Sequence, residues 1–117
     1  MKFNVLVELG RKFQKEFKRL QKKYPSLKGE LTELREILHN QPKTGTPIGS
    51  GIYKIRLAIK SKGKGKSGGA RIISYVETEI IGMVENNTVI LLTIYDKSEI
   101  STITKEEIQF LIEEIQR

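Results

Sequence analysis

A chain of 117 residues with a formal net charge of +7 is long enough for one domain with one hydrophobic core, and too short for separate binding and catalytic domains. It has no cysteine and one histidine, His39, which excludes a disulfide framework, a thiolate nucleophile and the usual cysteine-containing zinc sites. No stretch approaches the roughly 20 consecutive apolar residues that span a bilayer and no secretory leader is recognisable, so we expect a cytoplasmic protein without a membrane partner.

The first third of the chain predicts a strand followed by a helical hairpin. In residues 3–9 every second side chain is apolar and the intervening ones are Asn4, Leu6 and Glu8, a period-2 pattern typical of a short half-buried strand. Residues 11–23 predict an amphipathic helix that Pro25 ends, and Ser26 is a candidate cap for a second helix. The apolar stripes of the two helices consist of Phe13, Phe17 and Leu20, and of Leu27, Leu31, Leu34 and Leu38, the second opposite a glutamate-rich face.

The middle of the chain predicts a connection and then a strand with two different faces. Residues 40–51 contain two prolines and Gly45 and are expected to connect elements without regular structure. In residues 52–60, tyrosine, isoleucine and leucine side chains point to one face of the strand and Lys54, Arg56 and Lys60 to the other. One face is therefore expected in the core, and the other is cationic.

The last part of the chain predicts two further strands and a helix. After a Gly, Ser and Lys loop at 61–69, residues 70–84 read as a strand with a turn at Asn86-Asn87. Residues 89–95 are nearly continuously apolar, as in a central strand that is covered on both faces. Thr104 and Glu107 form a capping box at the start of a C-terminal amphipathic helix.

These elements predict one α+β domain over residues 1–117 with the order β-α-α-β-β-β-α. A mostly antiparallel twisted sheet is expected to pack against the N-terminal helical hairpin and the C-terminal helix.

Positive charge gathers in the middle of the chain. No Asp or Glu occurs between His39 and Val76, whereas eight Lys and Arg residues do. Because Lys and Arg two residues apart on a strand point the same way, the row predicts a site for a phosphate backbone, with Arg71 and Lys97 on adjacent elements. The alternative without a ligand is a solvated strand face whose charges improve solubility or protect a sheet edge. The basic residues of this stretch are Lys43, Lys54, Arg56, Lys60, Lys62, Lys64, Lys66 and Arg71.

Other candidate residues have simpler explanations. Gly65-Lys66-Ser67 lacks the upstream glycine and the following helix of a P-loop, so a hairpin tip is the favoured interpretation. Tyr95 is compatible with stacking on a base or with packing. His39 fits the end of a helix, and Asp96 fits a turn in which it accepts from local backbone N–H groups.

Three segments taken together resemble the RelE/HigB-like toxins of bacterial type II toxin–antitoxin modules. These are residues 51–58 (Gly-Ile-Tyr-Lys-Ile-Arg-Leu-Ala), residues 62–72 (Lys-Gly-Lys-Gly-Lys-Ser-Gly-Gly-Ala-Arg-Ile) and residues 95–99 (Tyr-Asp-Lys-Ser-Glu), and the order of elements is similar over nearly the whole chain. Two features depart from the pattern: the hairpin around residues 78–87 is longer, and the histidine of some relatives has no counterpart on the cationic face.

The resemblance implies a ribosome-dependent mRNA endonuclease that needs no metal or cofactor and that a co-expressed antitoxin inhibits. The ribose 2′-OH would attack the adjacent phosphate of message in the ribosomal A site, leaving a cyclic phosphate and a free 5′-OH. The roles implied are Lys54 and Arg56 on the attacking side and the scissile phosphate, Arg71 on the transition-state charge, and Lys97 as the acid for the leaving oxygen. The residues implied in binding RNA or the ribosome are Lys60, Lys62, Lys64, Lys66 and Tyr95.

Three other functions are compatible with the same sequence. ParE-like proteins share the fold but inhibit gyrase, so the fold alone does not decide between them. A non-catalytic RNA- or DNA-binding module would use the same face only to dock phosphates. A purely structural domain that binds one protein partner is a third alternative. The oligomeric state and the antitoxin interface are left open by the sequence.

Overall fold

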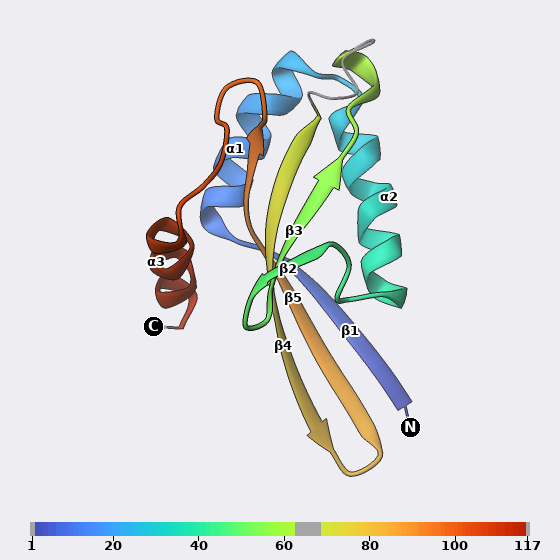
Figure 1. Ribbon diagram of the computed structural model, residues 1–117. Helices are drawn as coiled ribbons and strands as arrows, with labels where there is room; N and C mark the ends of the chain where they lie inside the picture. The colour runs from blue at the N-terminus through green and yellow to red at the C-terminus, as the bar shows by residue number, and fades with distance from the viewer. Residues whose placement is uncertain (1, 63–68, 117) are drawn as a thin grey trace.

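The computed structural model describes residues 2–62 and 69–116, which form three α-helices, five strands and a short 3₁₀ helix (Figure 1). The elements are β1 (Lys2–Leu9), α1 (Arg11–Lys23), α2 (Leu27–Asn40), β2 (Thr46–Gly49), β3 (Ile52–Leu57), η1 (Lys60–Lys62), β4 (Ala70–Ile81), β5 (Val84–Asp96) and α3 (Lys105–Ile115). No helix within the described residues has the length and apolar character needed to cross a membrane.

All five strands form one sheet in the order β1-β5-β4-β3-β2. Three pairings are antiparallel, but β1 runs parallel to β5, so the sheet is mixed. The α+β class is confirmed, whereas the predicted order of elements lacked one strand and the parallel pairing of β1 with β5 was not predicted. The parallel pairing follows from the crossover, because the chain leaves β1 through two helices and returns to its side only after β4.

The fifth strand is β2, which lies where an irregular connection was expected. Thr46 and Pro47 pair with Lys54 and Tyr53 of β3, and the other side of β2 is the edge of the sheet. Proline has no N–H to give to a ladder, but an edge strand can accommodate it because one side needs no partner. The prediction of an irregular connection is therefore wrong for Thr46–Gly49, which form an edge strand.

The turn of the β4–β5 hairpin was predicted at the wrong place. It lies at Gly82-Met83, and Asn87 is a buried strand residue. Gly82 has a φ of +60° and Met83 has no positive φ, which matches the type II′ turn that two-residue hairpins favour. The hairpin is long, with strands of 12 and 13 residues, and its far end extends beyond the helices (Figure 1).

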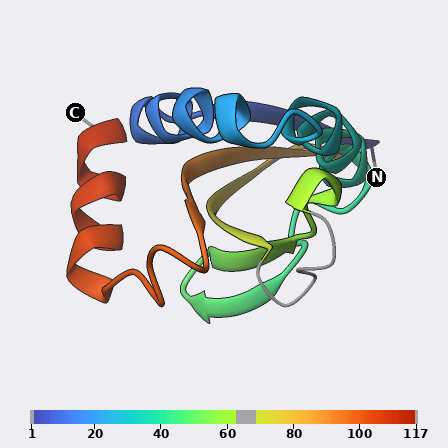
Figure 2. The same ribbon diagram turned by 90° about the horizontal axis from the view of Figure 1, so that it is seen from above.

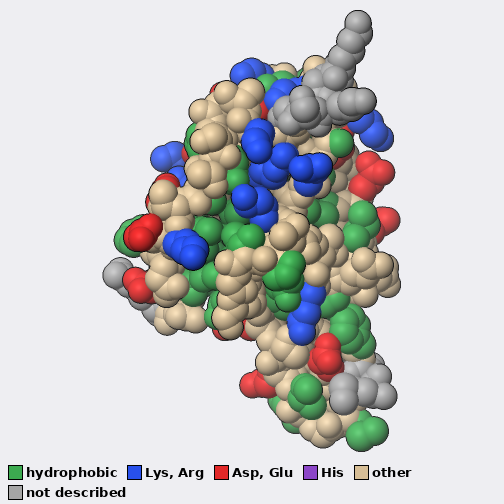
Figure 3. Space-filling view, viewed as in Figure 1, with side chains coloured by type: hydrophobic (Ala, Val, Ile, Leu, Met, Phe, Trp, Pro, Cys, Tyr) green, Lys and Arg blue, Asp and Glu red, His purple; other side chains and the backbone are tan. Residues whose placement is uncertain are grey.

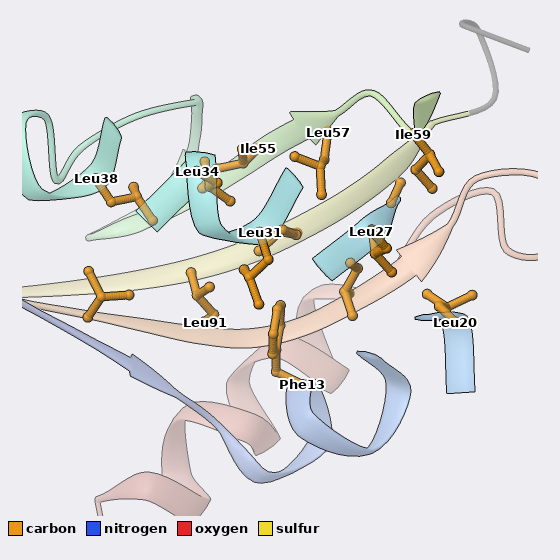
Figure 4. Close-up of a cluster of buried hydrophobic side chains, with 14 of the residues drawn as sticks. Phe13, Leu20, Leu27, Leu31, Leu34, Leu38, Ile55, Leu57, Ile59 and Leu91 are labelled. Carbon is orange, nitrogen blue, oxygen red and sulfur yellow. The ribbon is translucent and has the colours of Figure 1, made fainter. Parts of the chain in front are cut away.

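Helices α1 and α2 lie together on one side of the sheet, and α3 lies apart from them (Figure 2). Figure 4 shows side chains of α1 and α2 meeting those of β3 and β5. Of the predicted stripes, Phe17 is only partly buried and the other residues are buried, namely Phe13, Leu20, Leu27, Leu31, Leu34 and Leu38. The predicted helical hairpin and its apolar faces are therefore confirmed.

Two polar residues of α2 differ from their predicted roles. The Ser26 side chain does not cap α2, and its hydroxyl lies 2.8 Å from that of Ser61. Glu30 is buried rather than solvated, and its carboxylate accepts from the backbone N–H of Lys60 at 2.6 Å. Both contacts attach the start of α2 to the segment that follows β3.

Helix α3 begins with the predicted capping box. The Thr104 hydroxyl accepts from the backbone N–H of Glu107, and the Glu107 carboxylate accepts from that of Thr104. The buried face of α3 packs on the sheet face opposite α1 and α2. The residues of this second cluster are Ile73, Ile90, Leu92, Tyr95, Ile108, Leu111 and Ile112. Because β5 contributes to both clusters, it is the strand covered on both faces that the sequence predicted.

Candidate nucleic-acid interface

Two arginines lie directly opposite each other on neighbouring strands. Arg56 of β3 pairs with Arg71 of β4, which in turn pairs with Tyr95 of β5. Residues opposite each other share a face of the sheet, so both arginines lie on the face that carries α3. Lys and Arg side chains gather over the upper part of this face (Figure 3). The strand register therefore brings Arg71 to the same face as Arg56, which the sequence of residues 52–60 predicted to be cationic.

The Arg71 side chain is largely buried, and the described residues give it no compensating carboxylate. Arg71 is 7% exposed, and its Nη1 donates to the carbonyl of Ala70 at 3.3 Å. Among residues 2–62 and 69–116, no Asp or Glu oxygen lies within 4.0 Å of either Arg71 or Arg56. Like charges directly opposite each other on a sheet are destabilising, and a buried cation is costly unless it is paired. An anion bound between the two guanidinium groups would relieve both penalties.

Lys54 extends the same row by one step. It lies two residues before Arg56, opposite Ile73, and its side chain is half-buried. The step between Lys54 and Arg56 along the strand is about 6.6 Å. The three predicted residues Lys54, Arg56 and Arg71 are thus brought together on one face.

Lys97 lies at one end of this row, in the turn after β5. Its backbone N–H donates to the carbonyl of Gly69 at 3.3 Å, and Gly69 is two residues from Arg71. A Cβ at Gly69 would lie 2.5 Å from the carbonyl oxygen of Leu57, so a glycine is required where the ends of β3 and β4 approach. The backbone therefore places Lys97, an exposed residue, beside the start of β4.

The lysines predicted to bind RNA differ in their surroundings. Lys60 was predicted on the strand face with Lys54 and Arg56, but β3 ends at Leu57 and Lys60 lies in η1. It is exposed, and its ammonium group lies 3.9 Å from the Glu33 carboxylate of α2. Lys62 instead pairs at 2.9 Å with the buried Asp96, so its ammonium is already engaged within the fold. Lys64 and Lys66 lie outside the described residues. Lys60 is thus the member of this group with a solvated side chain within the described part of the chain.

Tyr95 is a core residue in this structure. It is 4% exposed and packs in the cluster beneath α3, so its ring takes the packing role and not base stacking. Its hydroxyl is buried without a hydrogen-bond partner among the described residues. Burial raises the pKa of Tyr95, and the nearby positive charge of Arg71 opposes that rise.

Asp96 organises a network that the sequence did not indicate. Its carboxylate accepts from the Ser98 backbone at 2.9 Å, as expected of a turn residue, but also from the Tyr24 hydroxyl at 2.7 Å and from Lys62. Burial alone would raise the pKa of Asp96, but these hydrogen bonds hold it well below its usual range. Tyr24 and Asp96 are separated by 72 residues, so no local pattern signals their contact.

Neither His39 nor the carboxylates of the described residues form a second site. His39 is exposed in the last turn of α2, where a cation is favourable. No three His, Cys, Asp or Glu side chains in the described ranges gather as metal ligands would. No protein-family model matches the chain.

Proposed function

We propose that this chain is the toxin of a type II toxin–antitoxin module, of the RelE/HigB-like kind, and that it cleaves mRNA in the ribosomal A site. The observation that carries the proposal is the Arg56–Arg71 pair. Arg56 and Arg71 lie opposite each other on β3 and β4, Arg71 is buried, and no carboxylate oxygen of the described residues lies within 4.0 Å of either side chain. Such a pair fits a phosphate group that bridges the two strands.

The proposed reaction is attack of the ribose 2′-OH on the adjacent phosphorus. The 2′-OH gives its proton to water as the 2′-oxygen forms a bond to phosphorus. The bond to the 5′-oxygen breaks, and once that oxygen is protonated the products are a cyclic phosphate and a free 5′-OH. Lys54 and Arg56 hold the attacking side and the scissile phosphate, and Arg71 stabilises the charge of the pentavalent transition state. Lys97 supplies the proton that the leaving 5′-oxygen needs.

The proposed partners are the ribosome with its message, and an antitoxin protein that inhibits the toxin. An acidic segment of the antitoxin lying over Lys54, Arg56 and Arg71 would compete with RNA for the same charges. The positive charge of the whole chain would speed association with either polyanion.

The proposal is tested by replacing one arginine on the cationic face and one arginine away from it. Arg71→Gln removes the buried guanidinium, and Arg35→Gln removes an exposed one from α2, on the other side of the sheet. Message 5′ ends are mapped in a translating extract with and without an inhibitor of translation. We expect Arg71→Gln to reduce cleavage by about 10²-fold or more, and Arg35→Gln to leave it unchanged. Intact messages with the wild-type chain under both conditions would refute the proposal.

A second candidate is a non-catalytic RNA-binding module. It is favoured by the make-up of the face itself, where Lys54, Arg56 and Arg71 are cations and no carboxylate or imidazole of the described residues joins them to act as a base. In that case RNA binding would fall steeply with salt while messages stay intact. Arrested growth with intact messages and no RNA binding would instead indicate gyrase inhibition.

A further inference from the structure

A groove lies between α3 and the β2–β3 edge of the sheet, on the same face as the arginine pair. Its volume is about 390 Å³. Its walls are apolar and come from both sides, with Ile48 and Ile52 on the strands and Ile103 and Ile108 at α3. Ile108 is buried and the other three are partly buried, so the groove is an opening in the cluster beneath α3.

The charged groups of the described residues that line the groove are all positive. Lys54 and Lys105 contribute ammonium groups and Gln109 contributes an amide, and the described residues that line the groove include no Asp or Glu. Lys54 belongs both to this groove and to the row that continues to Arg56, so the groove opens beside the arginine pair. An occupant with an apolar body and adjoining negative charge would complement it.

Lys105 is placed where helix stability disfavours it. It is the first residue of α3, and a positive charge at a helix N-terminus opposes the helix dipole. The next two residues, Glu106 and Glu107, have the favourable sign but do not line the groove. A binding role for Lys105 would account for a lysine at this position.

We propose that the groove binds the base of the RNA nucleotide next to the phosphate held by Arg56 and Arg71. This inference rests on the proposed function, since it assumes that the phosphate belongs to RNA. The isoleucine walls suit the two faces of an unstacked base, and the Gln109 amide can both donate to and accept from its edge. Lys54 and Lys105 neutralise the phosphates on either side of that nucleotide.

The test observes the groove directly, without cleavage. Isoleucine methyl groups are labelled for NMR and the protein is titrated with adenosine 5′-monophosphate, with ribose 5-phosphate as the probe that lacks a base. We expect saturable shifts of the Ile48, Ile103 and Ile108 methyl signals with the nucleotide and none with ribose phosphate. Gln109→Trp fills the groove from an exposed helix position and should weaken this binding by roughly fivefold or more.

The control is Gln41→Trp, an exposed glutamine at the end of α2 that does not line the groove. It should bind the nucleotide as the wild type does. The proposed base subsite would be overturned if the methyl signals of the groove isoleucines did not shift with the nucleotide. It would also be overturned if both tryptophan variants changed the affinity for the nucleotide equally. If messages are still cut in that case, the proposed function stands without it. If the methyl signals shift with the nucleotide but messages are not cut, the base subsite is supported as part of a non-catalytic RNA-binding module.

Discussion

Asp96→Asn should destabilise the fold far more than the loss of a surface carboxylate. The Asp96 side chain is fully buried and accepts hydrogen bonds from Lys62, Tyr24 and the Ser98 backbone at 2.7 to 2.9 Å. These contacts hold together the end of α1, the 3₁₀ helix after β3 and the end of β5. Asparagine keeps the shape but removes the negative charge that the partly buried Lys62 ammonium faces.

The magnitude follows from the loss of the Asp96 charge from a largely buried ion pair. Removing one partner of a buried ion pair costs roughly 3–5 kcal/mol. Asparagine retains an acceptor oxygen, so we expect the lower end, about 3 kcal/mol. For a domain of this length, that loss corresponds to a fall in Tm of roughly 12 °C.

The effect should also depend on pH with a definite sign. The folded-state pKa of Asp96 is held below its unfolded value of about 3.9. The charged carboxylate therefore contributes its full stability above the unfolded pKa, and that contribution is lost as the pH falls through the folded pKa. The difference in free energy of unfolding between wild type and Asp96→Asn should shrink between roughly pH 5 and pH 2.

The assay is urea denaturation at a series of pH values, with Glu33→Gln as the matched control. Glu33 also faces a lysine, Lys60, but at 3.9 Å and with 67% of its side chain exposed. Such a surface pair contributes under about 1 kcal/mol. Equal stabilities of Asp96→Asn and Glu33→Gln at pH 7, or a difference from wild type that grows as the pH falls, would refute the reasoning.

Three further predictions concern packing, the hairpin turn and the α3 cap. Phe13→Ala should lower the free energy of unfolding by about 3–5 kcal/mol in urea, whereas Phe110→Ala, at a side chain 59% exposed, should change it by less than about 1 kcal/mol. Gly82→Ala should cost about 1–2 kcal/mol in the same assay because its φ is +60°, while Gly29→Ala, in open space in α2, should stabilise by about 0.5–1 kcal/mol; equal signs would contradict this. Thr104→Ala should cost about 1 kcal/mol through the lost cap, and an unchanged thermal unfolding curve by circular dichroism would show that the capping box is unimportant.

The sequence was sufficient for features that repeat over short distances. Helical spacing predicted the buried faces of α1 and α2, and the capping box predicted the start of α3. Alternation along residues 52–60 predicted that Lys54 and Arg56 share a face of a strand. These predictions hold because the periods of helix and strand, and the reach of a cap, are set by a few neighbouring residues.

Local patterns were misleading where two signals competed. Asn86-Asn87 resembles a turn, yet the hairpin turns at Gly82, because a type II′ turn needs a positive φ at its first position. Pro47 and Gly49 resemble a loop, yet they belong to β2, since the edge of a sheet leaves one side of a strand without partners.

Only the tertiary structure decided which cations meet and which are already paired. The register of β3 on β4 sets Arg56 opposite Arg71, and a shift by one residue would have sent the two to opposite faces. The fold likewise directs Lys62 to Asp96, buries Tyr95 and opens the groove beside Lys54. The amino-acid sequence by itself determined that a cationic strand face exists. Its partners depend on contacts between residues far apart in the chain, which no periodicity encodes.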